Sequence, residues 1–310
     1  MNSSPVPAGI ITPREMIQRL NESIIGQEDA KKALSVAFWK QQMRARGKAL
    51  PSSGLLLYGP TGCGKTALVQ EAAKIADLPV LVFDATTLSE AGYRGRDAAD
   101  MIVDLVERYG RERATYGVIF LDEVDKLAAV KGNEYRAAYS RGTQHSLLKI
   151  VEGCETMANG SPFLTHNILF IFGGAFTGLW AEKMKYKVRN CICFEREKAS
   201  INDKVIAELS TDDFIAYGME PELMGRIGRC VAIHELSDEE LKQILLKSKL
   251  SVFQKYQTFF RSYQRDLDMN EETVEWLIRS TRERGLGARG LNTLVEEWVE
   301  TKLVELSEAI

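Results

Sequence analysis

The sequence predicts an α/β protein: a parallel sheet covered by helices, followed by a smaller and mostly helical C-terminal domain. Three features of the 310-residue chain lead to this prediction: a glycine-rich motif directly after an apolar run, further apolar runs separated by helical patterns, and helical patterns alone after residue 236. Continuous apolar runs are typical of parallel strands buried on both faces. A chain of this length has room for two domains, which we place at residues 1–235 and 236–310.

The first elements are expected to be two helices. Thr12 suits the N-cap position, Pro13 suits the first helical position, and Glu15 would close a capping box. Residues 28–46 carry apolar side chains on one face and are followed by Gly47, a common residue just beyond a helix.

Short apolar runs alternate with helical patterns in the middle of the chain. These expected strands lie at residues 55–58, 80–83, 118–121 and 168–172. We expect irregular loops at residues 131–142 and 155–165, whereas residues 181–212 show no clear pattern. Four helices are expected near the C-terminus, at residues 238–250, 252–261, 271–282 and 291–307.

Composition argues against several classes of protein. The 40 basic and 43 acidic residues nearly balance, so no overall charge favours nucleic acid or a membrane surface. No apolar run reaches the roughly eighteen residues of a membrane span, and the N-terminus lacks the pattern of a signal or transit peptide. The five cysteines are odd in number, and the three histidines add no zinc-ligand spacing, which argues against disulfides and structural zinc. We therefore expect a cytoplasmic protein.

The glycine-rich motif reads G-x-x-x-x-G-K-T between an apolar strand and a helix expected at residues 66–76. In this context the motif predicts a P-loop, whose backbone N–H groups converge on phosphate oxygens. Lys65 would reach the outer phosphates, and the Thr66 hydroxyl would bind Mg²⁺. We therefore expect a nucleoside triphosphate to bind at Gly59, Pro60, Thr61, Gly62, Cys63, Gly64, Lys65 and Thr66.

Two acids follow the strand expected at residues 118–121. In a P-loop protein the first acid, Asp122, would hold Mg²⁺ through its hydration shell, and Glu123 would act as the base that activates water. A surface Asp-Glu pair at a strand end is the alternative. The preceding apolar strand and the P-loop favour hydrolysis.

Further segments resemble the Clp group of the AAA+ ATPases, in the form found in ClpX unfoldases. The similar segments are residues 24–32, 84–93, 172–176, 221–226 and 287–291. Their order and spacing match the family over nearly the whole chain, from about Thr12 to Ile310. The resemblance implies an AAA+ large domain with a small helical domain, ATP as the nucleotide, and Ile24 and Ile25 on the adenine side.

The resemblance also implies roles for two arginines. Arg226 resembles the arginine finger, which reaches the nucleotide of a neighbouring subunit, and Arg289 resembles the sensor-2 arginine. Without the family pattern they would be interpreted as a surface ion pair and a helix-start residue. No polar sensor-1 side chain is evident, because the strand ends in Gly173 and Gly174.

The segment around Tyr93 resembles the first pore loop of the family. A tyrosine beside glycines could grip an extended polypeptide with little sequence preference, although it could also pack in a loop. Arg94 and Arg96 stand where ClpX usually has valine and glutamate. Despite the nearby Asp97, these charges predict a pore that favours acidic segments.

Other segments depart from the family. Only a short polar segment precedes Thr12, so we expect no delivery of substrates through a zinc-binding domain. The basic entrance loop is reduced to residues 153–165, which places recognition of the usual degradation tags in question. Ile192 and Phe194 retain the apolar anchors of the peptidase-docking loop, where a divergent loop without a partner is the alternative.

These features together predict an ATP-dependent protein unfoldase that acts as a ring homo-hexamer and threads polypeptides through its pore, with or without a ClpP-type peptidase. A remodelling chaperone that works without a protease is one alternative. A nucleic-acid motor, with Arg94 and Arg96 binding phosphates, is another. A scaffold that binds ATP but barely hydrolyses it is disfavoured by the intact Asp122, Glu123 and Arg226.

Overall fold

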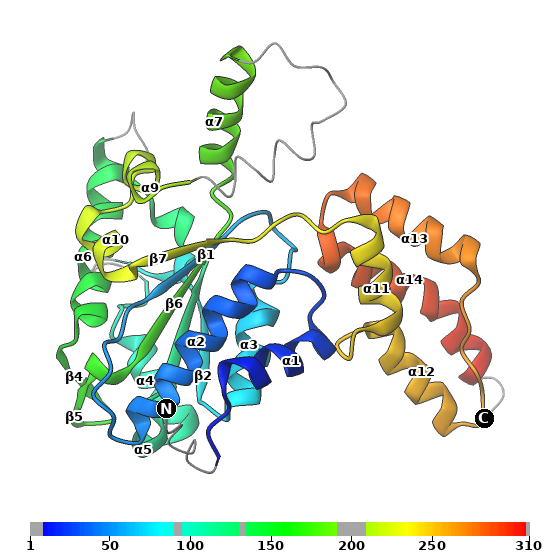
Figure 1. The fold of residues 1–310 in the computed structure, drawn as a ribbon, viewed down its shortest axis with the longest axis horizontal. Coiled ribbons are helices and arrows are strands. Elements are labelled where there is room, and N and C mark those ends of the chain that lie inside the picture. Colours follow the sequence, from blue (N-terminus) through cyan, green and yellow to red (C-terminus); the bar gives the residue numbers. More distant parts are fainter. Residues whose placement is uncertain (1–8, 90–94, 130–133, 191–208, 308–310) are drawn as a thin grey trace, which may run out of the picture.

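The computed structural model describes residues 9–89, 95–129, 134–190 and 209–307 (Figure 1). Its centre is a five-stranded parallel sheet with strand order β2-β3-β6-β1-β7. The strands are β1 (Leu55–Tyr58), β2 (Val80–Asp84), β3 (Val118–Asp122), β6 (Leu169–Gly174) and β7 (Arg229–Ala232). The predicted α/β class and the four predicted strands are confirmed. The edge strand β7 was not predicted.

Helices cover both faces of the sheet because successive strand residues point to opposite sides. In β1, Leu55 and Leu57 pack into one core, whereas Leu56 and Tyr58 pack into the other. The first core is completed by α1 (Pro13–Ser23), α2 (Glu28–Ala45) and α3 (Lys65–Ala76). The second is completed by α4 (Asp100–Tyr109), α6 (Glu134–Glu152), α7 (Thr177–Asn190), α9 (Thr211–Tyr217) and α10 (Pro221–Ile227).

The predicted start of the first helix is confirmed. The Thr12 hydroxyl accepts a hydrogen bond from the Glu15 backbone N–H at 3.3 Å, and the Glu15 carboxylate accepts one from the Thr12 N–H at 2.9 Å. This reciprocal capping box satisfies backbone donors that have no partner within the helix.

Both loop predictions between the third and fourth predicted strands were wrong. Residues 134–142 begin the long helix α6, whose buried apolar residues, such as Leu147, lie in its second half, so the first turns lack an apolar stripe. Residues 155–164 form a hairpin of β4 (Glu155–Ala158) and β5 (Ser161–Leu164). Its turn, Asn159-Gly160, has positive φ at both residues, as tight hairpins require.

Short turns complete the region around the sheet. They are α5 (Arg111–Ala114), η1 (Ala85–Thr87), η2 (Val124–Leu127) and η3 (Thr165–Asn167). The segment η2 directly follows β3 and leads along the carboxyl edge of the sheet, where the predicted site residues lie.

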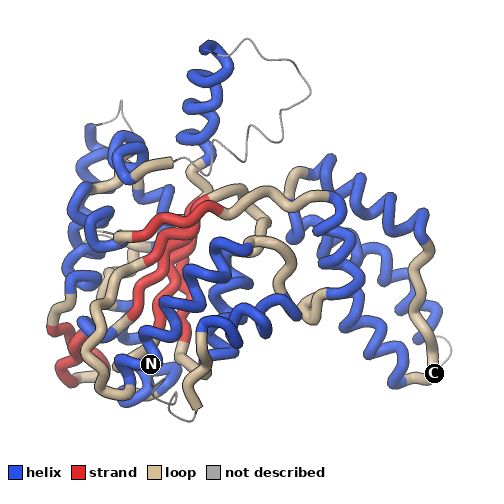
Figure 2. Tube along the Cα trace, viewed as in Figure 1, coloured by secondary structure: helices blue, strands red, loops and turns tan. Residues whose placement is uncertain are grey.

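Four helices form a separate C-terminal bundle, as predicted (Figure 2). They are α11 (Asp238–Lys247), α12 (Val252–Ser262), α13 (Glu271–Arg284) and α14 (Gly287–Ser307). Their core contains Leu241, Phe253, Leu277 and Val299, and includes no residue of the sheet. The division of the chain after residue 235 stays a prediction.

None of the helices in the described ranges is long and apolar enough to cross a membrane. The same residues contain no group of three or more His, Cys, Asp or Glu side chains that could hold a metal ion.

A buried glutamine in α2 should be important for the stability of the sheet. The Gln41 Nε2 donates to the carbonyl oxygens of Tyr116 at 3.0 Å and Asn167 at 2.7 Å, which precede β3 and β6. Gln41→Leu would remove both hydrogen bonds and leave the Asn167 carbonyl with only the longer one from Arg44 Nη1 at 3.4 Å, so we expect a loss of about 1–3 kcal/mol in the free energy of unfolding. Urea denaturation measures it. Lys32→Met, an exposed change in the same helix, is the control, and equal stability of the two variants would contradict the prediction.

Candidate active site

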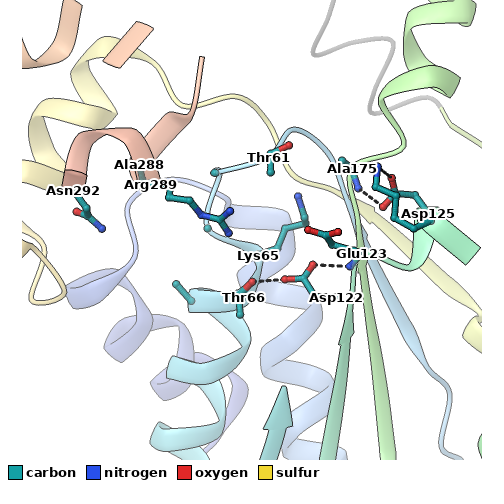
Figure 3. A pocket seen from close by; sticks show the side chains of 14 residues that line it. Thr61, Lys65, Thr66, Asp122, Glu123, Asp125, Ala175, Ala288, Arg289 and Asn292 are labelled. Atoms are coloured by element: carbon teal, nitrogen blue, oxygen red, sulfur yellow. Dashed lines mark hydrogen bonds and ion pairs between the residues drawn. The ribbon is translucent and has the colours of Figure 1, made fainter. Parts of the chain in front are cut away.

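A cavity of about 300 Å³ lies at the carboxyl edge of the sheet. One wall comes from the loop after β1, the start of α3 and the segment after β3. The opposite wall comes from the first turns of α14 (Figure 3). The residues with polar side chains that line it are Thr61, Lys65, Thr66, Asp122, Glu123, Asp125, Lys126, Arg289 and Asn292. Both the sheet region and the C-terminal bundle therefore contribute to a single site.

The glycine-rich loop (residues 59–66) approaches the C-terminal bundle backbone to backbone. Gly62 has φ +78°, a left-handed conformation, and a Cβ atom there would lie 2.1 Å from the Leu286 carbonyl oxygen. The Ala288 N–H donates to the Gly62 carbonyl at 3.0 Å. Only glycine fits both the conformation and the space.

The lysine and threonine of the motif lie where the sequence predicts them. The buried Lys65 Nζ donates to the carbonyl oxygens of Gly59 at 2.8 Å and Pro60 at 2.9 Å. Burial lowers the pKa of Lys65, and the nearby Cys63 and Asp122 oppose that shift. The amino group therefore lies beside the glycine-rich loop, whose Gly62 and Gly64 line the cavity.

Thr66 and Asp122 are in direct contact. The Thr66 hydroxyl donates to Asp122 Oδ2 at 2.6 Å, and Asp122 Oδ1 accepts from the Glu123 backbone N–H at 2.9 Å. The hydroxyl lies in the first turn of α3 and the carboxylate at the end of β3. Two such oxygen ligands side by side are suited to Mg²⁺. The described residues thus fit the predicted cation.

Glu123 adopts a strained backbone conformation. Its φ of 58° lies in the left-handed region, which costs a residue with a side chain roughly 1–2 kcal/mol. The side chain is exposed and lines the cavity beside Lys65 (Figure 3). The conformation turns the chain out of β3, so that two consecutive acids both reach the site.

Asp125 is a site residue that sequence reasoning missed. Its buried carboxylate accepts a hydrogen bond from the Ala175 N–H at 3.1 Å, directly beyond Gly173 and Gly174 at the end of β6. Asp125 therefore supplies a polar side chain where the strand itself offers none. The available signal was an acid three residues after Asp122, in a turn that returns to the edge of the sheet.

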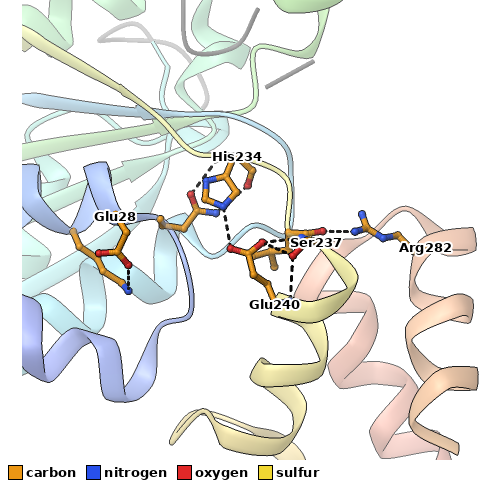
Figure 4. A network of polar contacts seen from close by, with 8 residues as sticks. Glu28, His234, Ser237, Glu240 and Arg282 are labelled. Carbon is orange, nitrogen blue, oxygen red and sulfur yellow. Dashed lines mark hydrogen bonds and ion pairs between the residues drawn. The ribbon is translucent and has the colours of Figure 1, made fainter. Parts of the chain in front are cut away.

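The linker between the sheet region and the C-terminal bundle (residues 233–237) is held by a polar network (Figure 4). The Gln27 side chain donates to the His234 carbonyl at 2.9 Å and accepts from the His234 N–H at 3.1 Å. The His234 ring lies 3.1 Å from Glu240. Partial burial raises the pKa of Glu240, but hydrogen bonds from Ser237 and His234 outweigh it, so the net pKa is lowered. The loop after α1 is thus tied to the linker.

Some predicted nucleotide residues lie outside the cavity lining. Ile24 and Ile25 are half-buried in the loop after α1, and Ile24 packs on the core of α1–α3. Pro60 and Cys63 line a neighbouring cavity of about 250 Å³ between the glycine-rich loop and the C-terminal bundle. Burial raises the pKa of the Cys63 thiol to about 11, so the thiol stays protonated near neutral pH.

The structure describes some of the residues predicted for the arginine finger, the pore and peptidase docking, but not all of them. Arg226 is exposed at the end of α10 and is not among the residues that line the cavity of the same chain. It forms an ion pair with Glu152 at 2.8 Å. Arg96 pairs with Asp104 at 2.6 Å and lies over the Phe83 ring. The remaining residues fall outside the described part of the chain: Tyr93, Arg94, Ile192 and Phe194.

Comparison with known families settles the class of the protein. The AAA domain family (Cdc48 subfamily) matches residues 50–230, which contain β1, β2, β3, β6 and the start of β7. The C-terminal D2-small domain of ClpB matches residues 236–308, which contain the C-terminal bundle. The chain belongs to the AAA+ ATPases. The cavity lies between the two matched regions.

Individual relatives place this AAA+ ATPase closer to one branch. It is 36% identical over 315 residues to the ATP-dependent Clp protease ATP-binding subunit ClpX of Treponema denticola, with 93% of this chain and 75% of the relative covered. It is 35% identical over 331 residues to the proteins of the same name from Borrelia duttonii and Borrelia recurrentis, with 98% of this chain and 76% of each relative covered. The protein is a homologue of ClpX.

Two glycine substitutions should separate backbone strain from contact between the two parts of the chain. Gly62 and Gly64 both have left-handed φ, of +78° and +92°, but a Cβ at Gly64 would meet no atom within 4 Å. Gly64→Ala should therefore cost only the strain, about 1–2 kcal/mol. Gly62→Ala should cost more, because it also displaces Leu286. Thermal unfolding without nucleotide measures both, and equal losses would show that the C-terminal bundle does not rest on Gly62.

Proposed function

We propose that this AAA+ ATPase is a protein unfoldase, which hydrolyses ATP in a ring of six copies and threads polypeptides through the central pore. The observation that carries the proposal is the placement of Arg226. It lies exposed at the end of α10, outside the cavity of its own chain. An arginine that completes a phosphate site in trans requires head-to-tail contacts, and such contacts close into a ring.

The groups that line the cavity would have different roles in binding and hydrolysing ATP. The backbone N–H groups of the glycine-rich loop and Lys65 bind the phosphates, and Arg289 approaches them from α14. Glu123 accepts the proton of the attacking water, the water oxygen bonds to the γ-phosphorus, and the bond to the β-phosphate oxygen breaks to release ADP. Mg²⁺, held at Thr66 and Asp122, would neutralise charge on the phosphate oxygens.

Two further parts of the site belong to the same proposal. Ile24 and Ile25 would contact the adenine, because Gln27 ties their loop to the linker beside the cavity. A large domain at residues 1–235 and a small domain at 236–310 would then rotate about this linker during each cycle.

For the polypeptide we propose Tyr93 as the gripping residue. Arg96 is neutralised by Asp104, so the preference for acidic segments would rest on Arg94. The same pairing weakens the nucleic-acid alternative, which needs both arginines. Unfolding of one substrate with acidic or basic tails tests the preference.

The proposal extends to a partner and a location. The relatives are named as subunits of a Clp protease, and Ile192 and Phe194 would dock a ClpP-type peptidase. We place the protein in the cytoplasm. Co-sedimentation with a peptidase ring tests the docking, and a remodelling chaperone without a protease remains if the chain does not co-sediment.

Replacing Glu123 should separate ATP binding from ATP hydrolysis. Glu123→Gln removes the base but keeps the size of the side chain, so ATP affinity should change little while hydrolysis falls about 10²- to 10⁴-fold. Calorimetry measures binding and phosphate release measures turnover. Glu107→Gln, an exposed acid on α4, is the control. Retention of more than a tenth of the turnover in Glu123→Gln would rule out this role.

The role of Tyr93 is tested by uncoupling hydrolysis from unfolding. Tyr93→Ala should hydrolyse ATP at a rate within about threefold of the parent. Tyr93 lies outside both the glycine-rich motif and the Asp122-Glu123 pair, and we assign it no contact with ATP. The variant should lose most of its unfolding of a stable fluorescent substrate, because an alanine offers little contact area. Tyr263→Ala, which removes an exposed tyrosine of α12's C-terminal end, is the control. Full unfolding speed in Tyr93→Ala would refute the threading model.

A further inference from the structure

We propose that Gln144 is a positioning residue, which couples the chain's own cavity to Arg226, the finger that would act on a neighbouring subunit. This inference rests on the proposed function, since it requires Arg226 to act in trans. It assigns a role to a side chain of α6 that the motif analysis did not single out. A series of contacts, which runs from Glu123 to the start of α10, supports the assignment.

The side chain of Gln144 is fully buried, and both ends of its amide are engaged. Its Nε2 donates to the carbonyl oxygens of Leu127 at 2.9 Å and Gly218 at 3.1 Å. Its Oε1 accepts from the Glu220 backbone N–H at 2.8 Å. Two donors and an acceptor on one small planar group require a primary amide. Because a lost contact would leave a buried polar atom without a partner, the amide fixes the joined segments relative to one another.

The first of these contacts reaches the segment that follows the proposed base. Glu123 directly precedes η2, and Leu127 is the last residue of η2. Between them, the Asp125 carboxylate accepts from the Ala175 N–H and so holds η2 against the end of β6. Since Glu123 and Asp125 both line the cavity, a change on this side of the cavity would be passed along η2 to Gln144.

The other two contacts reach the start of α10. Glu220 is the N-cap residue of this helix, and its own side chain makes no capping hydrogen bond, so Gln144 supplies one from α6. Gly218 also packs closely on the segment after η2. The Ala129 N–H donates to the Gly218 carbonyl at 2.8 Å, and a Cβ at Gly218 would lie 2.5 Å from the Ala129 carbonyl oxygen. The start of α10 is therefore tied to the segment that leaves the cavity.

The helix α10 thus has a fixed start and an exposed end. It is seven residues long, or about 10 Å, and Arg226 lies in its last turn. Figure 1 shows α6 beside α10, and α6 contacts both ends of the shorter helix. Gln144 holds the start from the interior, whereas Glu152 meets Arg226 at the surface in a weak ion pair. Movement of η2 would therefore move the start of α10 and displace Arg226.

The test uses rings that are mixed from two inactive chains. The Arg226→Ala chain keeps its base but offers no finger, whereas the Glu123→Gln chain offers a finger but lacks the base. With the Glu123→Gln chain in excess, the Arg226→Ala chains receive fingers from Glu123→Gln neighbours, so mixing should restore ATP turnover. Phosphate release per Arg226→Ala chain measures the restored turnover.

Gln144→Met is then introduced into one of the two chains at a time. This change keeps the length of the side chain and removes all three hydrogen bonds. In the finger-donating Glu123→Gln chain it should lower the restored turnover about tenfold or more, because misplacing a catalytic group by about 1 Å can cost that much. In the Arg226→Ala chain the loss should stay below about threefold, because Asp125 still holds η2 at the cavity.

This asymmetry separates positioning from a general loss of stability, which would lower turnover in both arrangements. His145→Ala, which removes an exposed contact of 3.7 Å with the same Glu220, is the control and should change turnover less than about twofold. Equal losses in the two arrangements, or no loss in the finger-donating chain, would overturn the assignment. Loss of ATP binding by Gln144→Met, measured by calorimetry, would also overturn it. If the two parent chains restore no turnover when mixed, the proposed finger in trans is itself wrong.

Discussion

The active site depends on one backbone contact, the approach of the glycine-rich loop to the start of α14. The Gly62 carbonyl accepts from the Ala288 N–H, and no side chain fits between Gly62 and Leu286. Since Arg289 is the next residue, its backbone is held beside the glycine-rich loop by this hydrogen bond. Under the proposed function, a phosphate that shifts the loop would also shift the start of α14.

The linker provides a second route between the same two parts. The Ile233 N–H donates to the Tyr58 carbonyl, which continues the pairing of β1 with β7 up to the glycine-rich loop. Immediately beyond it, His234 is held by Gln27, and its ring contacts Glu240 in the first turn of α11. The sheet edge, the loop after α1 and the bundle thus converge within a few residues. Rotation of the bundle has a defined pivot, which a nucleotide between the two parts can control.

Local signals were sufficient for the elements that carry the chemistry. The apolar run of β1, the glycines after it and the acids after β3 could be predicted because each signal lies within a few residues. The strand β7 could not, since it has four residues, begins with an exposed Arg229 and buries only Val231. The contact of Gly62 with Leu286, and that of Asp125 with Ala175, join distant parts of the chain, so no short window of sequence contains them.

The ion pair of Arg226 and Glu152 bears on the proposed role of Arg226 as a finger between subunits. Both side chains are largely exposed, so the pair contributes only about 0–1 kcal/mol. That energy is small beside a charge-assisted, bidentate contact of a guanidinium with a phosphate. Glu152 therefore holds the arginine in an extended position on the surface without competing strongly for it. Under the proposed function, a nucleotide of a neighbouring subunit would displace the carboxylate at little cost, so this weak ion pair is compatible with a finger that acts between subunits.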